Sequence, residues 1–345
     1  MRIAMLTRVL PRPDYAGGVS GQVHLLAATL QRRGCDVTVY AQNGPPPQSP
    51  YRVQCVGRPS DGAGSLRSIF LFPWHLSRLS FDDYDVVHAH GDDHLLRTKT
   101  PVVRTFYGSA RGECRHASTV RRRVYYGSMV IPEVLAERRA TARVAISTAM
   151  LKELTAPAHV IPCAYDSDVF SPSGVKSARP SILFVGDLGT RKRAELLLQV
   201  FESTVRPALP DAELWLVTSA GVEGAGVRWY GRVTSAALAD LYRRAWVFCM
   251  PSLYEGFGVP YVEAMASGTP FVATPNGGAN EVLGSTAGGW IVDDAQLGDS
   301  LVALLRDGGR RESMRVAALE RVRTYEIGCV ADRYLELYGR VIRAV

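Results

Sequence analysis

Residues 251–270 read Pro-Ser-Leu-Tyr-Glu-Gly-Phe-Gly-Val-Pro-Tyr-Val-Glu-Ala-Met-Ala-Ser-Gly-Thr-Pro, and this stretch decides the fold. Its two carboxylates, Glu255 and Glu263, stand eight positions apart around a Gly-Phe-Gly-Val-Pro turn. Pro260 suits the first position of a helix, where its missing N–H costs nothing. Gly268 suits the position just past a helix end, and the proline that follows at 270 prevents continuation. The pattern therefore predicts an acidic loop that leads into a helix of roughly two turns.

The start of that helix has the character of a phosphate site. Gly256 and Gly258 allow the backbone to bend so that the first amides of the helix face a cavity. Free amides at a helix start, together with the positive end of the helix dipole, attract phosphate. A carboxylate on either side suits a ligand that carries hydroxyls as well as phosphates, and a nucleotide sugar is such a ligand. The alternative is an ordinary loop-to-helix junction with an exposed glutamate at each end.

Strand-like and helix-like segments alternate from the start of the chain. Residues 3–7 read as a buried strand, residues 21–33 as a helix that Gly34 ends, and residues 37–40 as the next strand. A β-α-β unit within about 40 residues indicates a parallel sheet and an α/β fold class. Further strand-like runs follow at 85–90, 101–106, 144–147 and 159–162.

A second series of strands begins after a change in composition. Residues 171–180, rich in serine and proline, are the clearest linker in the chain. Beyond them, strand-like runs recur at 182–186, 214–217, 227–230, 246–250 and 270–274. Two α/β runs of similar length predict two doubly wound domains, residues 1–172 and 173–326, followed by a helix over residues 327–345. Ligands of such sheets bind beyond the carboxyl ends of the strands, here in the cleft between the domains.

Composition excludes several classes of protein. The 345 residues include no apolar run near the ~20 needed to span a bilayer, and the N-terminus does not resemble a signal peptide, so we expect a cytoplasmic protein. Six cysteines without a C-x-x-C pair predict free thiols and no metal site. The net charge of +7 favours anionic partners. Arg121, Arg122 and Arg123 form the densest basic stretch, which suits a solvated face or a peripheral contact with a membrane surface or acceptor; no nucleic-acid motif accompanies it.

The segment from 251 to 270 closely resembles the E-x7-E signature of the retaining glycosyltransferases of family 4. The resemblance implies the GT-B fold, in which two doubly wound Rossmann-like domains face a central cleft and a C-terminal helix crosses back to the N-terminal domain. It also implies roles for single residues. Glu255 would face the donor sugar and Glu263 would hold the ribose hydroxyls. The backbone of Phe257, Gly258 and Val259 would cradle the diphosphate.

Other parts of the chain resemble the donor-binding loops of this family. Gly17 and Gly18, between the first strand and the first helix, resemble the loop that lies against the donor phosphate and acceptor. Lys192 falls on the family's diphosphate lysine. Asp187, however, replaces an arginine and Arg193 replaces a glycine, so we expect Arg191 or Arg193 to supply the missing phosphate contact.

Two further positions complete the predicted site. Arg232 follows a strand, as in the family segment near the nucleotide base. Tyr107 stands where family members commonly carry histidine, close to the reacting carbon, and we place it with Glu255 in the catalytic group. A tyrosine at this position is larger than histidine and stays neutral at physiological pH, which predicts an altered contact at that end of the donor or a shifted acceptor pocket. A partly buried tyrosine without a role is the alternative.

These observations predict a metal-independent, retaining glycosyltransferase that moves a sugar from a nucleoside-diphosphate sugar to an acceptor hydroxyl. The nucleotide sugar is a co-substrate, and no further cofactor is expected. We expect a small soluble metabolite or natural product as acceptor, with a cell-envelope lipid or polysaccharide as the alternative. A GT-B nucleotide-sugar epimerase and a non-catalytic nucleotide-sugar-binding protein are the rival functions.

Overall fold

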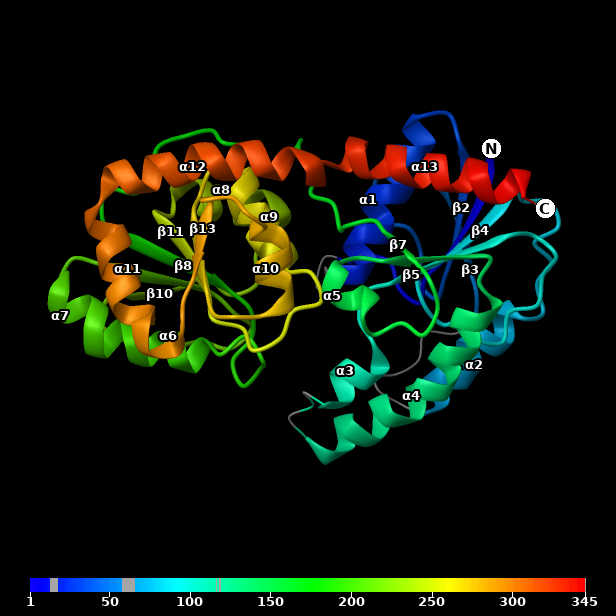
Figure 1. Cartoon of the computed structure of the whole chain (residues 1–345), viewed down its shortest axis with the longest axis horizontal. Coiled ribbons are helices and arrows are strands. Elements are labelled where there is room, and N and C mark those ends of the chain that lie inside the picture. The colour runs from blue at the N-terminus through cyan, green and yellow to red at the C-terminus, as the bar shows by residue number, and fades with distance from the viewer. Residues whose placement is uncertain (13–17, 58–65, 116, 118, 345) are drawn as a thin grey trace. The chain divides into compact units, whose positions relative to one another are not determined.

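The chain forms two compact units, each built around one parallel sheet (Figure 1). The computed structural model describes residues 1–12, 18–57, 66–115, 117 and 119–344. Unit 1 comprises Met1–Ala164 together with the final segment that begins at Ile327, and unit 2 comprises Tyr165–Glu326. The two predicted Rossmann-like domains are therefore present, and the fold class is α/β.

Unit 1 contains a seven-stranded parallel sheet with the order β3-β2-β1-β4-β5-β6-β7. The order reverses at β1, as in a doubly wound fold. The strands are β1 (Arg2–Leu6), β2 (Asp36–Ala41), β3 (Arg52–Cys55), β4 (Val86–Ala89), β5 (Val102–Phe106), β6 (Ala142–Ala145) and β7 (His159–Val160). The helices are α1 (Gly18–Arg32), α2 (Leu66–Leu76), α3 (Ala110–Arg115), α4 (Val120–Arg139), α5 (Thr148–Leu151) and α13 (Ile327–Arg343).

The sheet of unit 1 is buried on both faces. Side chains alternate along β1, so Ile3 and Met5 join one core while Ala4 and Leu6 join the other. The first core is closed by α1 and α13, which pack side by side (Figure 1). Phe72 on α2 belongs to the second. Strands covered on both faces read as continuous apolar runs, which is why the sequence pattern reveals them.

Helix α13 belongs to unit 1, although almost the whole of unit 2 precedes it in the chain. Its tyrosines reach into the sheet: the Tyr338 hydroxyl lies 2.6 Å from His88 Nδ1, and the Tyr334 hydroxyl lies 2.9 Å from Thr105 Oγ1. His88 Nε2 lies 2.8 Å from the same Thr105 oxygen. A buried polar network thus joins the last helix to β4 and β5.

The start of unit 2 differs from the boundary expected at 172/173. Residues 165–172 group with unit 2 because the Tyr165 amide donates to the Tyr325 carbonyl at 3.0 Å and the Ser167 hydroxyl donates to Glu326 at 3.0 Å. Composition marks the linker by its prolines and serines. It does not register these hydrogen bonds to residues far along the chain.

Unit 2 contains a six-stranded parallel sheet with the order β10-β9-β8-β11-β12-β13. Its strands are β8 (Ser181–Val185), β9 (Glu213–Val217), β10 (Val227–Trp229), β11 (Val247–Met250), β12 (Phe271–Ala273) and β13 (Gly289–Ile291). Its helical segments are α6 (Ala194–Val200), η1 (Phe201–Val205), α7 (Arg206–Ala208), α8 (Ser235–Arg244), α9 (Val259–Ala266), α10 (Gly277–Leu283), η2 (Asp294–Gln296), α11 (Leu297–Arg306), α12 (Gly308–Val322) and η3 (Arg323–Tyr325). Large aromatic side chains fill its interior, among them Trp215, Tyr242, Phe248, Tyr261 and Phe271.

Candidate functional site

The segment with the two glutamates forms the predicted loop and helix. It leaves the sheet at the carboxyl end of β11, and α9 begins at Val259 with Pro260 in its first turn. The helix ends at Ala266, and Gly268 follows with a φ of +72°. The Gly268 amide donates to the Met265 carbonyl at 3.0 Å, which satisfies one of the last carbonyls of the helix. Local residue chemistry therefore sets both ends of α9.

Two glycines are required for the turn before α9. Gly258 has a φ of +89°, and a Cβ there would lie 2.5 Å from the Tyr261 ring. Gly278 lies on α10, where a Cβ would stand 2.6 Å from the Phe257 carbonyl oxygen and 2.8 Å from the Glu255 Cβ. The loop is thus pressed between its own helix and α10, so its shape is fixed by packing and not only by its sequence.

The loop presents backbone amides at the start of α9. Within the part of the chain that the structure describes, the amides of Phe257, Gly258 and Val259 donate no hydrogen bond. Phe257 and Gly258 are buried, and buried amides are normally paired. Phe257 cannot swing away easily, since its ring packs edge-on against Tyr325 with 5.4 Å between ring centroids. These three amides are therefore available to donate hydrogen bonds to a ligand.

Glu255 is buried beside this turn. Its side chain is 7% exposed, and it accepts a hydrogen bond from the Ser252 hydroxyl at 2.9 Å. Arg191 donates to the other carboxylate oxygen at 3.1 Å. Ser252 is itself held by Asn276, whose amide donates to the Ser252 carbonyl at 3.2 Å. The carboxylate that the sequence places toward the sugar is therefore oriented from two sides.

Glu263 lies on α9, facing inward. The Tyr242 hydroxyl on α8 donates to it at 3.2 Å. Burial raises the pKa of Glu263 to about 7, and the opposing effects of the Tyr242 hydrogen bond and the Lys192 charge are smaller. Near neutral pH, such a carboxyl group can accept a hydrogen bond from a sugar hydroxyl when it is ionised, or donate one when it is protonated.

Lys192 interacts electrostatically with both glutamates. Burial lowers the pKa of Lys192, while the charges of Glu255 and Glu263 act on it in the opposite direction. Its Nζ donates to the Val185 carbonyl at 3.0 Å. Gly186 makes room for the lysine chain, since a Cβ at that glycine would lie 2.4 Å from the lysine Cδ. The predicted lysine and both predicted carboxylates therefore belong to one electrostatic cluster in unit 2.

The two arginines beside Lys192 have different surroundings. Arg193 donates to Asp294 through Nη1 at 2.6 Å and Nη2 at 2.8 Å, and its Nε donates to the Pro251 carbonyl at 2.7 Å. Arg191 donates through Nε to the Tyr254 carbonyl at 2.8 Å and through Nη2 to Glu255. Arg193 is thus held by Asp294 and a backbone carbonyl, whereas Arg191 lies at the Glu255 carboxylate.

Asp187 and Arg232 lie at the edge of the same cluster. Hydrogen bonding from the Ser219 side chain, and then from the Ser219 amide, which donates to Asp187 at 2.9 Å, lowers the pKa of the Asp187 carboxyl. The positive charge of Arg232, which follows β10, acts on Asp187 in the same direction. Asp187 is therefore an anion at the position where the family pattern has an arginine.

The predicted residues of unit 1 are described separately. Gly17 lies outside the described residues, and Gly18 is the first residue of α1. Tyr107 follows β5, and its hydroxyl lies 3.0 Å from His90 Nδ1. The tyrosine lines a cavity of about 10 Å³, room for one water molecule, together with Gln22, Cys163 and Tyr334. Tyr107 thus stands at the carboxyl end of the sheet, where ligands of this fold bind.

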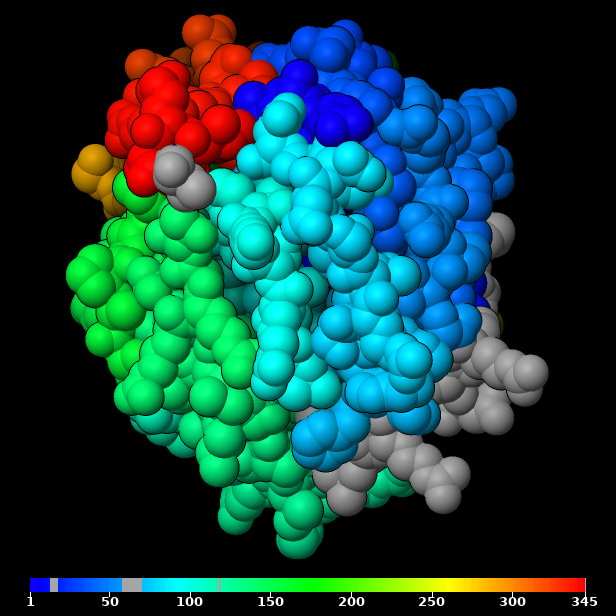
Figure 2. Space-filling model, turned by 90° about the vertical axis from the view of Figure 1, so that its right-hand side faces the viewer, coloured from blue at the N-terminus to red at the C-terminus, as the bar shows by residue number. Residues whose placement is uncertain are grey.

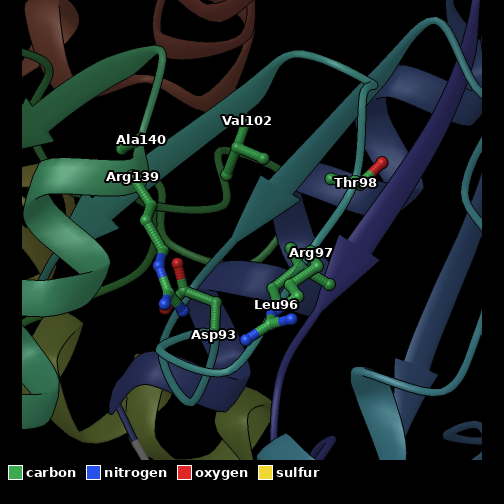
Figure 3. A pocket seen from close by; sticks show the side chains of 7 residues that line it. All are labelled: Asp93, Leu96, Arg97, Thr98, Val102, Arg139 and Ala140. Atoms are coloured by element: carbon green, nitrogen blue, oxygen red, sulfur yellow. The ribbon is translucent and has the colours of Figure 1, made fainter.

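A larger hollow of about 420 Å³ lies elsewhere in unit 1 (Figure 3). Arg139 and Arg97 extend toward the Asp93 side of this hollow. Asp93 forms a buried ion pair with Arg104 on β5. None of the predicted site residues lines the hollow.

Sequence reasoning missed the residues that support the site. Ser252, Tyr242, Asn276 and Gly278 orient or pack against the two glutamates and their loop, but they come from three separate segments. Only Ser252 lies near a motif residue in sequence. Among the described residues, no group of three or more His, Cys, Asp or Glu is arranged to hold a metal ion.

Comparison with known proteins agrees with this arrangement. The family model described as "Glycosyltransferase Family 4" matches residues 16–169, and the model described as "Glycosyl transferases group 1" matches residues 179–307. The phosphatidyl-myo-inositol mannosyltransferase of Mycobacterium leprae is 30% identical over 95% of this chain and 94% of its own. The chain belongs to glycosyltransferase family 4.

One further relative is similar over the whole chain, and one solved structure has the same fold. The alpha-maltose-1-phosphate synthase of Mycobacterium tuberculosis is 27% identical to this glycosyltransferase over 99% of the chain and 100% of the relative. The solved structure of the sucrose-phosphate synthase from Thermosynechococcus elongatus superposes with a TM-score of 0.82 at 20% identity, and the match covers 100% of both chains. The fold is GT-B, and the enzyme is a glycosyltransferase, as the sequence predicts.

The raised pKa of Glu263 predicts a pH-dependent effect of Glu263→Gln on stability. Between about 4.5, its ordinary pKa, and about 7, the folded chain keeps a proton that the unfolded chain has lost. The stability that this proton contributes is lost as the pH rises through about 7. Glutamine stays neutral and can still accept from Tyr242. We therefore expect Glu263→Gln to raise the free energy of unfolding by about 1–3 kcal/mol at pH 8, and by much less at pH 5.

Urea unfolding of the two proteins at both pH values measures this difference. Glu223→Gln, at an exposed glutamate of unit 2, is the matched control and should change stability by less than about 0.5 kcal/mol at either pH. An equal effect of Glu263→Gln at pH 5 and pH 8 would show that ionisation of this carboxyl does not cost stability.

Proposed function

We propose that this glycosyltransferase is a retaining, metal-independent enzyme that moves a sugar from a nucleoside-diphosphate sugar to an acceptor hydroxyl. One observation carries the proposal. In unit 2, the three unpaired amides at the start of α9 lie between the carboxyl groups of the buried Glu255 and the partly buried Glu263, and the charges of both act on Lys192. The middle of this site offers hydrogen-bond donors to an anion, and both sides offer carboxylates that accept from hydroxyls. Such a site suits a ligand in which a diphosphate joins two sugars.

Each group has a part in this proposal. The amides of Phe257, Gly258 and Val259, with Lys192, stabilise the charge that develops on the leaving diphosphate. Glu263 holds the ribose hydroxyls, and Glu255 positions the transferred sugar. The acceptor attacks from the face that the diphosphate leaves, and the leaving phosphate takes the acceptor's proton. No protein nucleophile is assigned, so Glu255 acts as a hydrogen-bond acceptor.

Tyr107 and Gly18 belong to unit 1, and their roles rest on the resemblance to the family. Tyr107 stands at the position of the family histidine near the reacting carbon. Its hydrogen bond with His90 fixes the ring and leaves a neutral hydroxyl at the carboxyl end of β5. We propose that this hydroxyl contacts the donor sugar or the acceptor. Arg232 is proposed to lie near the nucleotide base.

Glu255→Gln tests the central assignment. Glutamine keeps the size of the side chain and an oxygen for Ser252, so the fold should remain. It loses the negative charge that orients sugar hydroxyls, and a missing transition-state contact of this kind lowers turnover by about 100-fold or more. A thermal-shift screen first identifies a nucleotide sugar that stabilises the protein. Consumption of that donor is then measured with a panel of acceptors for both proteins. Normal turnover in a folded Glu255→Gln variant would contradict the role of Glu255.

The same assay separates transfer from the rival reactions. A transferase consumes the donor faster when acceptor is present, whereas an epimerase converts the donor without an acceptor. Stabilisation by a nucleotide sugar without turnover on any acceptor would favour a binding protein.

A lipid acceptor is the second candidate, favoured by the surface of unit 1. Large apolar side chains are exposed on α2 and α4: Phe70, Leu71, Trp74, Val120, Val124 and Ile131. Figure 2 shows this side of the unit, where the light-blue and cyan residues that precede residue 100 lie beside the green segment that includes α4. Arg121, Arg122 and Arg123 are exposed on α4. A relative named for phosphatidyl-myo-inositol matches nearly the whole chain. No helix among the described residues has the length and apolarity to cross a bilayer.

Liposome flotation decides between the two acceptor classes. If the acceptor is a lipid, the protein should float with vesicles that contain anionic phosphatidylinositol and remain at the bottom with phosphatidylcholine alone, because exposed apolar and cationic side chains act together. Replacement of Val120, Val124 and Ile131 by serine should abolish flotation, with Val316→Ser, at an exposed valine of unit 2, as the control. Equal absence of flotation on both vesicles would favour the soluble acceptor.

A further inference from the structure

We infer that Arg191 is the second cation of the diphosphate site, and that it leaves its ion pair with Glu255 to bind the donor. The inference rests on the proposed function and deepens it. Arg191 makes the phosphate contact that Asp187 cannot make. When Arg191 moves to the donor, Glu255 loses its ion pair and can bind the sugar.

The site lacks one cation at the position that the family pattern provides. Asp187 carries a negative charge there, and the Ser219 amide holds its carboxylate at 2.9 Å. Among the described residues, Lys192 and Arg191 are cations whose charges act on each other in this cluster, and Arg232 acts on Asp187 at its edge. A diphosphate carries more charge than one lysine balances, so a further cation is needed.

Arg193 is unsuited to this role. Its guanidinium makes a two-fold hydrogen bond with Asp294, and Nη2 also donates to the Thr274 hydroxyl at 3.1 Å. Its Nε donates to the Pro251 carbonyl, so every nitrogen of the group is engaged. The residue has a φ of +55°, a conformation that L residues adopt only when their surroundings hold them there. Moving Arg193 would leave Asp294 and a backbone carbonyl unpaired.

Arg191 keeps part of its guanidinium group available for a ligand. Its side chain is 36% exposed, whereas the Glu255 side chain is 7% exposed. Its Nη1 has no hydrogen-bond partner in the described part of the chain. An arginine presents a planar fork that binds two oxygens of one phosphate, which suits it to this ligand more than a lysine. Arg191 can therefore turn its free edge to the donor, and the Glu255 oxygen that it leaves then accepts a hydrogen bond from the donor's sugar.

Glu255 links this movement to sugar recognition. Before the donor binds, the ion pair with Arg191 neutralises the carboxylate and occupies one of its oxygens. When the guanidinium moves to the diphosphate, that oxygen becomes available to a sugar hydroxyl, while the Ser252 hydroxyl continues to hold the other. The sugar-facing carboxylate is thus exposed only when a diphosphate is present.

The first test compares nucleotides that differ by one phosphate. UDP, GDP and ADP are screened by calorimetry against the wild-type chain, and the tightest binder is then compared with its own monophosphate. Arg191→Met should weaken binding of the diphosphate by about tenfold or more, the usual effect of losing a hydrogen bond between charged groups, and should change monophosphate binding much less. Arg191→Lys should restore part of the loss.

Arg193→Met is the matched control, since it removes an adjacent arginine of the same size. It should lower the urea midpoint, because Asp294 loses its partner, and it should change binding of both nucleotides in parallel. A selective loss of diphosphate binding in Arg193→Met, or a parallel loss for both nucleotides in Arg191→Met, would overturn the inference.

Glu255→Gln supplies a second test that does not depend on the Arg191 variants folding. Removing the carboxylate frees Arg191, so binding of the sugar-free diphosphate should tighten by several-fold even though turnover is lost. Unchanged or weaker diphosphate binding in this variant would contradict the switch. If the wild-type chain binds a diphosphate but Arg191→Met binds it equally well, the inference fails and the proposed function stands; if no nucleotide binds to the wild type, the proposed function itself fails.

Discussion

Everything at this site depends on a loop that must remain bent so that three amides stay unpaired. Gly258 permits the left-handed backbone, and Gly278 lets α10 press against the loop at a distance that no other residue allows. Buried amides without partners are costly. The packing of unit 2 therefore stabilises a conformation that the loop would not keep by itself, and the proposed diphosphate would offset that cost by accepting from the three amides.

The negative charges of the two glutamates beside this loop are compensated by different partners. Glu255 has an arginine and a serine as direct partners, whereas Glu263 has one tyrosine and relies on Lys192 at longer range. Burial outweighs the partners of Glu263 and raises its pKa. Buried charge thus destabilises the folded chain where the proposed ribose contact lies, and such tension between stability and function is common at binding sites.

The sequence predicts the parts of this structure that depend on neighbours along the chain. The ends of α9 follow from Pro260 and Gly268, and the buried parallel strands follow from apolar runs. Strands β3 and β13 escape the sequence pattern because neither contains an apolar run: β3 is largely exposed, and β13 is only Gly-Trp-Ile. Composition also placed the start of unit 2 too late, since hydrogen bonds to residues 325 and 326 decide it.

The roles of Arg191 and Arg193 show where sequence reasoning stops. Both arginines follow the same strand and flank the same lysine, so the pattern leaves them equivalent. Glu255, the partner of Arg191, is 64 positions away, and Asp294, the partner of Arg193, is 101 positions away. Only the folded chain separates the arginine bound to the scaffold from the arginine at the site. The residue-by-residue roles carried over from the family remain predictions.

A crystal structure of the chain with the nucleoside diphosphate that it binds most tightly tests the account most directly. The account predicts that the diphosphate lies on the amides of Phe257, Gly258 and Val259, with the ribose hydroxyls on Glu263 and Lys192 against the phosphates. A diphosphate bound away from the start of α9, or a ribose without contact to Glu263, would contradict it.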